Sequence, residues 1–386
     1  MQMVKKTILI LSLGVAAAWF SVSSLAQRGP AAETRAAAVA AASQNFLATL
    51  DDSERKKVVF DFKDAEQRKR WSNLPVGSVP RAGLRMGDLK QPQREAAMAV
   101  LKAALSPQGY DKVIQIVEAD EALRAGGGGG KAGGKGGEGK AGDEKAKGDQ
   151  AKGDSAKGDK AKGPKAGGKG GGASFGRDNY FISFLGQPSA SEPFMIQFGG
   201  HHLGINMTFA GERGTLAPSH TGAQPARFEL EGKTVRPLGR EVDKAFALYS
   251  SLDEAQRKQA TLGFEMRDLA LGPGRDGQMI EPEGIKGANL TEKQRTMLID
   301  LVSEWTGIIH DAAATAKLEE VKKNIAETWF AWSGPPEKGG AAYFRVHGPT
   351  AFIEFAPQRL GGDPTNHIHT IYRDPTNEYG AKWWKP

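Results

Sequence analysis

Two short pairs of histidines are the residues of this sequence best suited to bind a metal ion. Residues 198–206 read FGGHHLGIN, with His201 and His202 adjacent, and residues 366–375 read NHIHTIYRDP, with His367 and His369 spaced one apart. Four of the seven histidines of the chain therefore fall in two segments, and the absence of cysteine removes thiolate ligands. Imidazole is the commonest protein ligand for zinc, copper and iron. We expect one composite site that uses both pairs to hold Zn, Cu or Fe.

The spacing of each pair determines how its rings can point. On a strand over residues 367–373, His367 and His369 share one face. His201 and His202 would face opposite sides of a regular strand, but the two glycines before them allow a turn that re-aims one ring. An open histidine site could activate water for hydrolysis, or carry redox chemistry with copper or iron. The alternative is a non-catalytic exported binding or structural module whose histidines only brace strand ends.

Three further polar residues are candidates for binding a substrate. Arg373 would lie on the same strand face as the second histidine pair, and a guanidinium group can hold a carboxylate with two hydrogen bonds. An ion pair with Asp374 or Glu354 is the structural alternative for Arg373. Asn206 and Glu354 occupy matching positions in the two halves of the chain. Together these residues predict a small anionic substrate.

The chain repeats itself, which predicts an internal duplication. FLATLDDSERKK (46–57) resembles LYSSLDEAQRKQ (248–259), and GLRMGDLKQPQREA (83–96) resembles GIKGANLTEKQRTM (284–297), at offsets of 202 and 201 residues. NYFISFLGQP (179–188) resembles TWFAWSGPP (328–336) at an offset of 149. The fall of 52 in the offset is close to the length of a low-complexity segment at 125–173. The break in register thus has an independent cause.

Each half is predicted to contain helices followed by antiparallel β-strands, which is an α+β fold. Asp51, Asp253 and Thr291 each precede a Glu or Gln by three residues, as at a capped helix start. EPFMIQFGGHHLGINMTFAG and AAYFRVHGPTAFIEFAP each read as two strands around a turn. We expect structural roles for His220, which lies in a proline-rich loop, and for His310, at the end of a helix.

The first 26 residues are predicted to be a signal peptide. Lys5 and Lys6 precede the apolar run TILILSLGVAAAWFSV (7–22), and Ser24-Leu25-Ala26 provides small residues for cleavage before Gln27. The run of 16 residues is short for a spanning helix, which needs roughly 20. We expect a periplasmic or extracellular protein without a membrane segment after cleavage. A retained membrane anchor is the alternative.

The positive charge of the chain lies outside its predicted globular parts. Of the net charge of +7, Lys5 and Lys6 contribute two, and residues 125–173 contribute five through eleven lysines against six acidic residues. The remainder is neutral, so we expect no nucleic-acid binding by the folded part. Residues 125–173 hold no aromatic or β-branched residue and predict a disordered spacer, with a polycation for acidic surfaces as the alternative.

These patterns divide the chain into five predicted parts. They are a signal peptide (1–26), the helical part of the first half (27–124), a disordered Gly/Lys-rich insertion (125–176), the β-rich part of the first half (177–240), and the second half (241–386).

Three segments resemble a known family. FGGHHLGINMTF, LSPQGYDKVIQIVE and HIHTIYRDPTNEYG are similar to signature segments of the family called domain of unknown function 3500. The resemblance runs from about residue 35 to the C-terminus and is interrupted by the low-complexity segment, which departs from the family pattern. It implies an exported, often bacterial protein. It implies no activity, so a mechanism must be argued from the residues.

Overall fold

The structure is a computed structural model that describes residues 34–126, 175–360 and 362–384. These residues belong to one compact unit. The predicted signal peptide lies outside the described residues, and so does most of the predicted insertion. In the described part of the chain, no helix is both long enough and apolar enough to cross a membrane.

The helices of the described residues are α1 (Arg35–Ala48), α2 (Asp52–Val58), α3 (Ala65–Arg68), α4 (Gln91–Ala104), α5 (Pro107–Ala125), α6 (Gly239–Ser251), α7 (Glu254–Ala260), α8 (Glu292–Thr306) and α9 (Asp311–Lys323). The helices other than α4 and α6 begin after a residue whose side chain caps the first turn. Capping boxes at Asp51, Asp253 and Thr291 start α2, α7 and α8, as predicted. The sequence predicted His310 at the end of a helix, but His310 is instead the N-cap of α9.

Twelve strands of the described residues form one sheet. The strands are β1 (Val59–Phe60), β2 (Leu84–Arg85), β3 (Phe181–Leu185), β4 (Phe194–Gly199), β5 (Leu203–Ala210), β6 (Arg213–Thr215), β7 (Ser219–Ala223), β10 (Ile285–Lys286), β11 (Trp329–Ser333), β12 (Tyr343–His347), β13 (Phe352–Pro357) and β14 (Ile368–Arg373), while β8 (Phe228–Leu230) and β9 (Lys233–Val235) form a separate hairpin.

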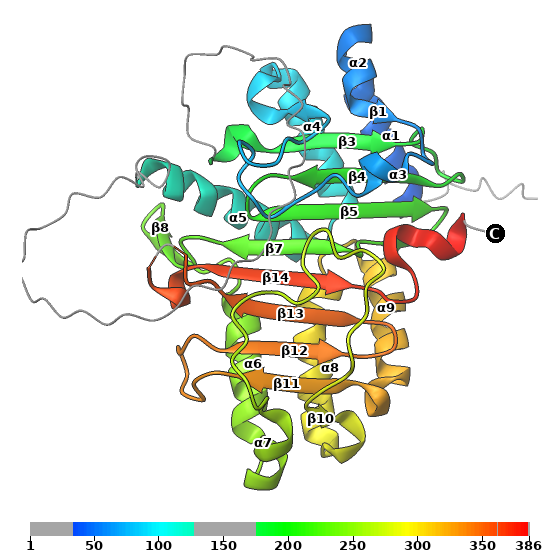
Figure 1. Ribbon diagram of the computed structural model, residues 1–386. Coiled ribbons are helices and arrows are strands. Elements are labelled where there is room, and N and C mark those ends of the chain that lie inside the picture. The colour runs from blue at the N-terminus through cyan, green and yellow to red at the C-terminus, as the bar shows by residue number, and fades with distance from the viewer. Residues whose placement is uncertain (1–33, 127–174, 361, 385–386) are drawn as a thin grey trace, which may run out of the picture. The chain divides into compact units, whose positions relative to one another are not determined.

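The main path of the sheet runs β1-β3-β4-β5-β7-β14-β13-β12-β11-β10, with β2 beside β3 and β6 beside β5 (Figure 1). All pairs are antiparallel except β1 with β3. The last strand of the chain, β14, therefore lies in the middle of the sheet, against β7 of the first half. This order brings the segments that carry the two histidine pairs to one region.

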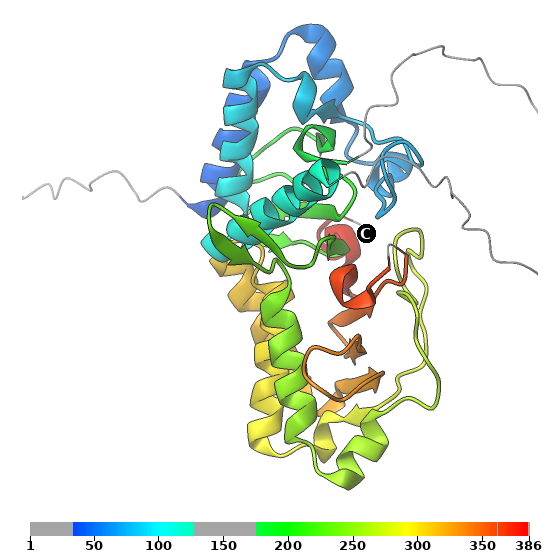
Figure 2. The same ribbon diagram turned by 90° about the vertical axis from the view of Figure 1, so that its left-hand side faces the viewer.

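Helices cover one face of the sheet, and two long loops pass over the other face (Figure 2). The loops are residues 61–83, interrupted only by α3, and residues 262–284. Since both faces are covered, all eight residues of β5 are buried, which explains why the central strands are more continuously apolar than a half-exposed strand. The helices and the largely antiparallel sheet confirm the predicted α+β class.

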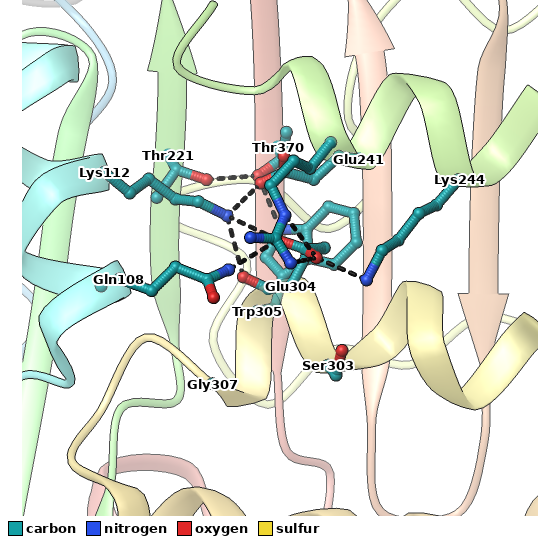
Figure 3. Close-up of polar contacts among 12 residues, drawn as sticks. Gln108, Lys112, Thr221, Glu241, Lys244, Ser303, Glu304, Trp305, Gly307 and Thr370 are labelled. Atoms are coloured by element: carbon teal, nitrogen blue, oxygen red, sulfur yellow. Dashed lines mark hydrogen bonds and ion pairs between the residues drawn. The ribbon is translucent and has the colours of Figure 1, made fainter.

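A buried charge network joins α5 to α6 and α8 inside the helix layer (Figure 3). The Lys112 ammonium donates to a carboxylate oxygen of Glu241 and to the backbone carbonyl oxygen of Glu304, at 3.0 Å. Its distance to the Glu304 carboxylate is 3.6 Å. Arg240 and Lys244 also contact the Glu304 carboxylate, at 2.9 and 2.6 Å. The network ties a helix of the first half to two helices of the second.

Candidate metal centre

The two histidine pairs meet at the junction of β4, β5, β7 and β14. The Nε2 atom of His202 lies 3.2 Å from Nε2 of His367, which in turn lies 3.1 Å from Nε2 of His369. One nitrogen from each of the three rings falls within 4.8 Å of the other two. All three side chains are buried, and His202 is fully so. Residues separated by 165 positions in the chain thus point three ring nitrogens at one place.

A turn and a glycine position these rings. His201 and His202 occupy the turn between β4 and β5, which the Gly200 amide closes by donating to the carbonyl oxygen of Leu203 at 2.8 Å. Across the sheet, His369 is paired with Gly222 of β7. A Cβ on Gly222 would lie 3.2 Å from Cδ2 of His202 and 2.8 Å from a backbone oxygen. The glycine therefore leaves the space that the His202 ring occupies.

Asp120 of α5 anchors the His202 ring from behind. Its Oδ1 lies 2.5 Å from Nδ1 of His202, and its Oδ2 accepts a hydrogen bond from the Tyr180 hydroxyl at 2.7 Å. Burial alone would raise the pKa of Asp120, but His202 and His201 beside it hold that pKa well below its usual range. The carboxylate is therefore charged, and it fixes the proton of His202 on Nδ1.

The same reasoning sets the proton of His367. Its Nδ1 lies 2.6 Å from the carbonyl oxygen of Leu360, which can only accept, so Nδ1 carries the hydrogen. His202 and His367 consequently face each other with unprotonated Nε2 atoms at 3.2 Å. Two lone pairs at that distance repel unless a cation or a proton lies between them. A metal ion requires unprotonated ring nitrogens of this kind as ligands.

The distances from His367 to the other two rings match ligands that share one ion. With metal–nitrogen bonds of about 2.0–2.1 Å, nitrogens 3.1–3.2 Å apart subtend roughly 100° at the metal. That angle lies between octahedral and tetrahedral geometry. The third ring, His369, has its Nδ1 3.2 Å from the Asn73 amide nitrogen. A flip of that amide presents its oxygen, which would fix the hydrogen of His369 on Nδ1 as well.

Asp120, His201 and His202 form a second cluster of potential ligands, but it is not suited to a metal. Their closest contact, 2.5 Å between Asp120 and His202, is a charge-assisted hydrogen bond and leaves no room for an ion bonded to both atoms. His201 Nδ1 lies 3.7 Å from the same carboxylate oxygen, and its ring packs 4.7 Å from that of Phe175. His201 therefore lies beside the three-histidine cluster without joining it.

The cluster favours uncharged rings. Burial lowers the pKa of His202 to about 4 and also lowers the pKa values of His367 and His369. The neighbouring imidazoles act in the same direction, because each disfavours a second positive charge. A metal ion binds neutral imidazole, so the pocket keeps its ligands in the binding form at neutral pH.

The predicted substrate residue Arg373 belongs to another network. Its guanidinium lies 2.5 Å from the Glu378 carboxylate and 3.4 Å from that of Asp276, and it donates to the carbonyl oxygens of Leu271 and Gly272 at 2.7 and 2.9 Å. These contacts fasten the 262–284 loop to the sheet. Arg373 makes no polar contact with the four histidines within the described residues.

Asn206 and Glu354 also make their hydrogen bonds elsewhere in the sheet. Glu354 accepts from the Tyr343 hydroxyl at 2.5 Å and from two backbone N–H groups of the 262–284 loop. Asn206 accepts from Gln197 at 2.9 Å and donates to the carbonyl oxygen of Pro218 at 2.9 Å. Both side chains are fully buried. Neither contacts the histidine cluster in the described part of the chain.

Three neighbours of the cluster were not identified from the sequence. Asp120 looks like one of several acidic residues on a helix, and Asn73 lies in an irregular loop. His220 was expected in a loop but lies in β7, fully buried, with its ring 5.1 Å from that of His369. Only the pairing of β7 with β14 reveals that His220 is a neighbour of the cluster, since that pairing sets His220 opposite Ile371 and beside His369.

A protein-family model described as "Protein of unknown function (DUF3500)" matches residues 32–381. Neither the curated proteins nor the solved structures contain a match to the chain.

Proposed function

The chain belongs to the DUF3500 family, whose description gives no activity, and from the geometry above we propose that it is a metal-binding protein with one centre built from His202, His367 and His369. The observation that carries the proposal is the convergence of three Nε2 atoms whose other nitrogens are held by hydrogen-bonding groups. Zinc, copper and iron suit neutral imidazole ligands. His201, named with these three from the sequence, lies next to the centre and not at it.

The reaction class that fits best is metal-assisted hydrolysis. Three protein ligands with a fourth position for water is the pattern of catalytic zinc sites, where the metal lowers the pKa of the bound water. A copper or iron ion in the same ligand set would instead support oxidoreductase chemistry. A small anionic substrate is part of this proposal, but its attraction would come from the metal charge, because acidic partners already neutralise Arg373.

A non-catalytic role is the second candidate, and one observation favours it. The three ligands are nearly or fully buried and come from both halves of the chain. A metal there would fasten β14 to the turn between β4 and β5, and so would stabilise the folded state by its binding free energy.

Metal content tests the proposal. Protein freed of any affinity tag should hold about one equivalent of zinc, copper or iron by elemental analysis, or take it up on addition. The double variant H367Q/H369Q should lose it while its circular dichroism is unchanged. H347Q is the matched control, since His347 is a buried histidine outside the cluster. Failure of the wild-type protein to retain any of the three metals would refute the metal centre.

A cobalt-substituted protein separates the two candidate roles. In an open centre, azide would replace the bound water and change the visible absorption of Co²⁺. In a closed structural centre the spectrum would not respond to azide, while removal of the metal would lower the melting temperature. A response to azide combined with an unchanged melting temperature would contradict the structural role.

We further propose that the two halves arose by duplication. The order of two helices, a short strand, two helices and then strands recurs in both halves, with β1 and α3 as additions before the short strand β2 of the first half. Antiparallel pairing sets Thr221 opposite Thr370, which are 149 residues apart, the offset found in the sequence for the strand region. Ser106 N–H donates to Ile308 O, and His310 N–H to Ala104 O, a reciprocal exchange between the halves. Export through residues 1–26 is likewise a proposal, supported by the sequence of that segment.

A further inference from the structure

A cleft of about 550 Å³ opens beside the start of α6, away from the metal centre. Its floor is apolar and comes from α6, its N-cap and the helix-facing side of the sheet, through Leu238, Val242, Phe246, Phe344, Phe355 and Ile368. The segments that flank the β8–β9 hairpin line one side, and residues 338–342 line another. Cavities of about 300–1,000 Å³ with apolar walls and few polar groups are typical of small-molecule sites.

The mouth of the cleft carries an excess of positive charge. Arg227, Arg236 and Lys338 line it, against Asp243 and Asp363. Asp243 is shared, at 2.9 Å from Arg236 and 3.5 Å from Lys338. Arg227 lies within ion-pair distance of no carboxylate in the described part of the chain. One guanidinium is thus available to a ligand at the rim.

The two remaining polar features of the rim act in opposite directions. Asp363 accepts hydrogen bonds from the neutral amide and hydroxyl of Thr365 and keeps its negative charge, so three cations against two carboxylates leave the rim with one net positive charge. Helix α6 begins at Gly239, which lines the cleft, and its N-cap is Leu238, whose side chain cannot accept a hydrogen bond. The Gly239 N–H donates to the carbonyl oxygen of Arg236 at 3.0 Å, so the partial positive charge of this 13-residue helix comes from the N–H groups that follow, which the Leu238 side chain does not cap.

We propose that this cleft binds a carboxylate with a single apolar tail. The tail would lie on the floor of leucine, valine, phenylalanine and isoleucine side chains, where it removes apolar surface from water. The carboxylate would lie at the rim, where Arg227 can bind it with two hydrogen bonds. The proposal does not depend on the metal centre, because Ile368 faces the cleft while His367 and His369 point to the opposite side of the sheet.

Isothermal titration with decanoate tests the proposal. Two probes separate its two parts: decyltrimethylammonium has the same tail with the opposite charge, and butyrate has the same head without the tail. We expect decanoate to bind at least tenfold more tightly than either. Equal affinity for decanoate and decyltrimethylammonium would overturn the anion site, and equal affinity for decanoate and butyrate would overturn the apolar floor.

Two variants locate the binding. R227E should weaken decanoate binding at least tenfold, because the change removes a cation and adds a carboxylate at the rim. V242E, at a half-buried position on α6, should weaken it at least as much by placing a charge on the floor. R275E, an equal charge change on an exposed position of the 262–284 loop, is the control. Absence of decanoate binding to wild-type protein, or equal affinities of R227E and R275E, would refute the site.

Discussion

Replacing Asp120 by Asn isolates the contribution of the anchoring carboxylate to metal affinity. The substitution keeps the size and one acceptor oxygen but removes the charge that lies 2.5 Å from His202 Nδ1 at a position without solvent exposure. Loss of a group that orients a metal-binding histidine costs about 10- to 100-fold in metal affinity. We therefore expect D120N to weaken metal binding by about 1.4–2.7 kcal/mol, at roughly 1.4 kcal/mol per tenfold.

The assay is competition for Zn²⁺ against a chromogenic chelator at pH 7.5, with circular dichroism as the check on folding. Y180F tests whether the effect passes through the His202 ring, because it removes only a hydroxyl that donates to the other carboxylate oxygen. We expect Y180F to change the affinity less than threefold. E118Q alters a half-buried acid on the same helix that pairs with Arg177 and should have no effect. A D120N protein within twofold of wild type would refute the anchoring role.

Three other predictions concern stability. K112M should lower the free energy of unfolding by about 3–5 kcal/mol, because Glu241 would remain buried without its cation. The double variant K112M/E241Q should recover much of this loss. Equal urea midpoints for wild type and K112M would contradict the prediction. The metal-free protein should lose stability as the pH falls from about 6.5 to 4. Burial lowers the pKa of His202 to about 4 in the folded protein, so in this range the histidine binds a proton in the unfolded chain but not in the folded one. A melting temperature that stays constant over this range would argue against burial of the rings. Deletion of residues 126–172 should leave the melting temperature within a few degrees of wild type, since glycine- and lysine-rich sequence buries little apolar area, and a large fall would show that this segment packs.

Local signals in the sequence predicted the elements, because those signals act over a few residues. Asp51, Asp253 and Thr291 cap helices through contacts three residues away, so their role is readable without the fold. The alternation of His367 and His369 likewise sets both rings on one side of a strand. The prediction that the two histidine pairs meet rested on the small number of histidines and on the repeat, and no local rule supports it.

Contacts across the sheet and between layers could not be read in this way. The position of α5 against the sheet determines that Asp120 contacts His202. No spacing within α5 distinguishes Asp120 from Glu118 or Glu121. Arg373 lies on the expected strand face, yet the 262–284 loop brings Asp276 to it and occupies its guanidinium. The path of a long loop over a sheet depends on packing, which periodicity in the sequence does not encode.

The central position of β14 sets the order in which the centre can form. His202 and His367 are 165 residues apart, and closing a flexible loop of that length costs about 4.5 kcal/mol in chain entropy, from (3/2)RT ln n. A metal ion held by one pair alone would have to offset this cost to collect its third ligand from an unfolded chain. The sheet instead brings β14 against β7 through backbone pairing, so the ligands are assembled before the ion arrives. Metal uptake would then follow folding, and a chain that lacks the final strand would lose two of the three ligands together with the strand that joins β7 to β13.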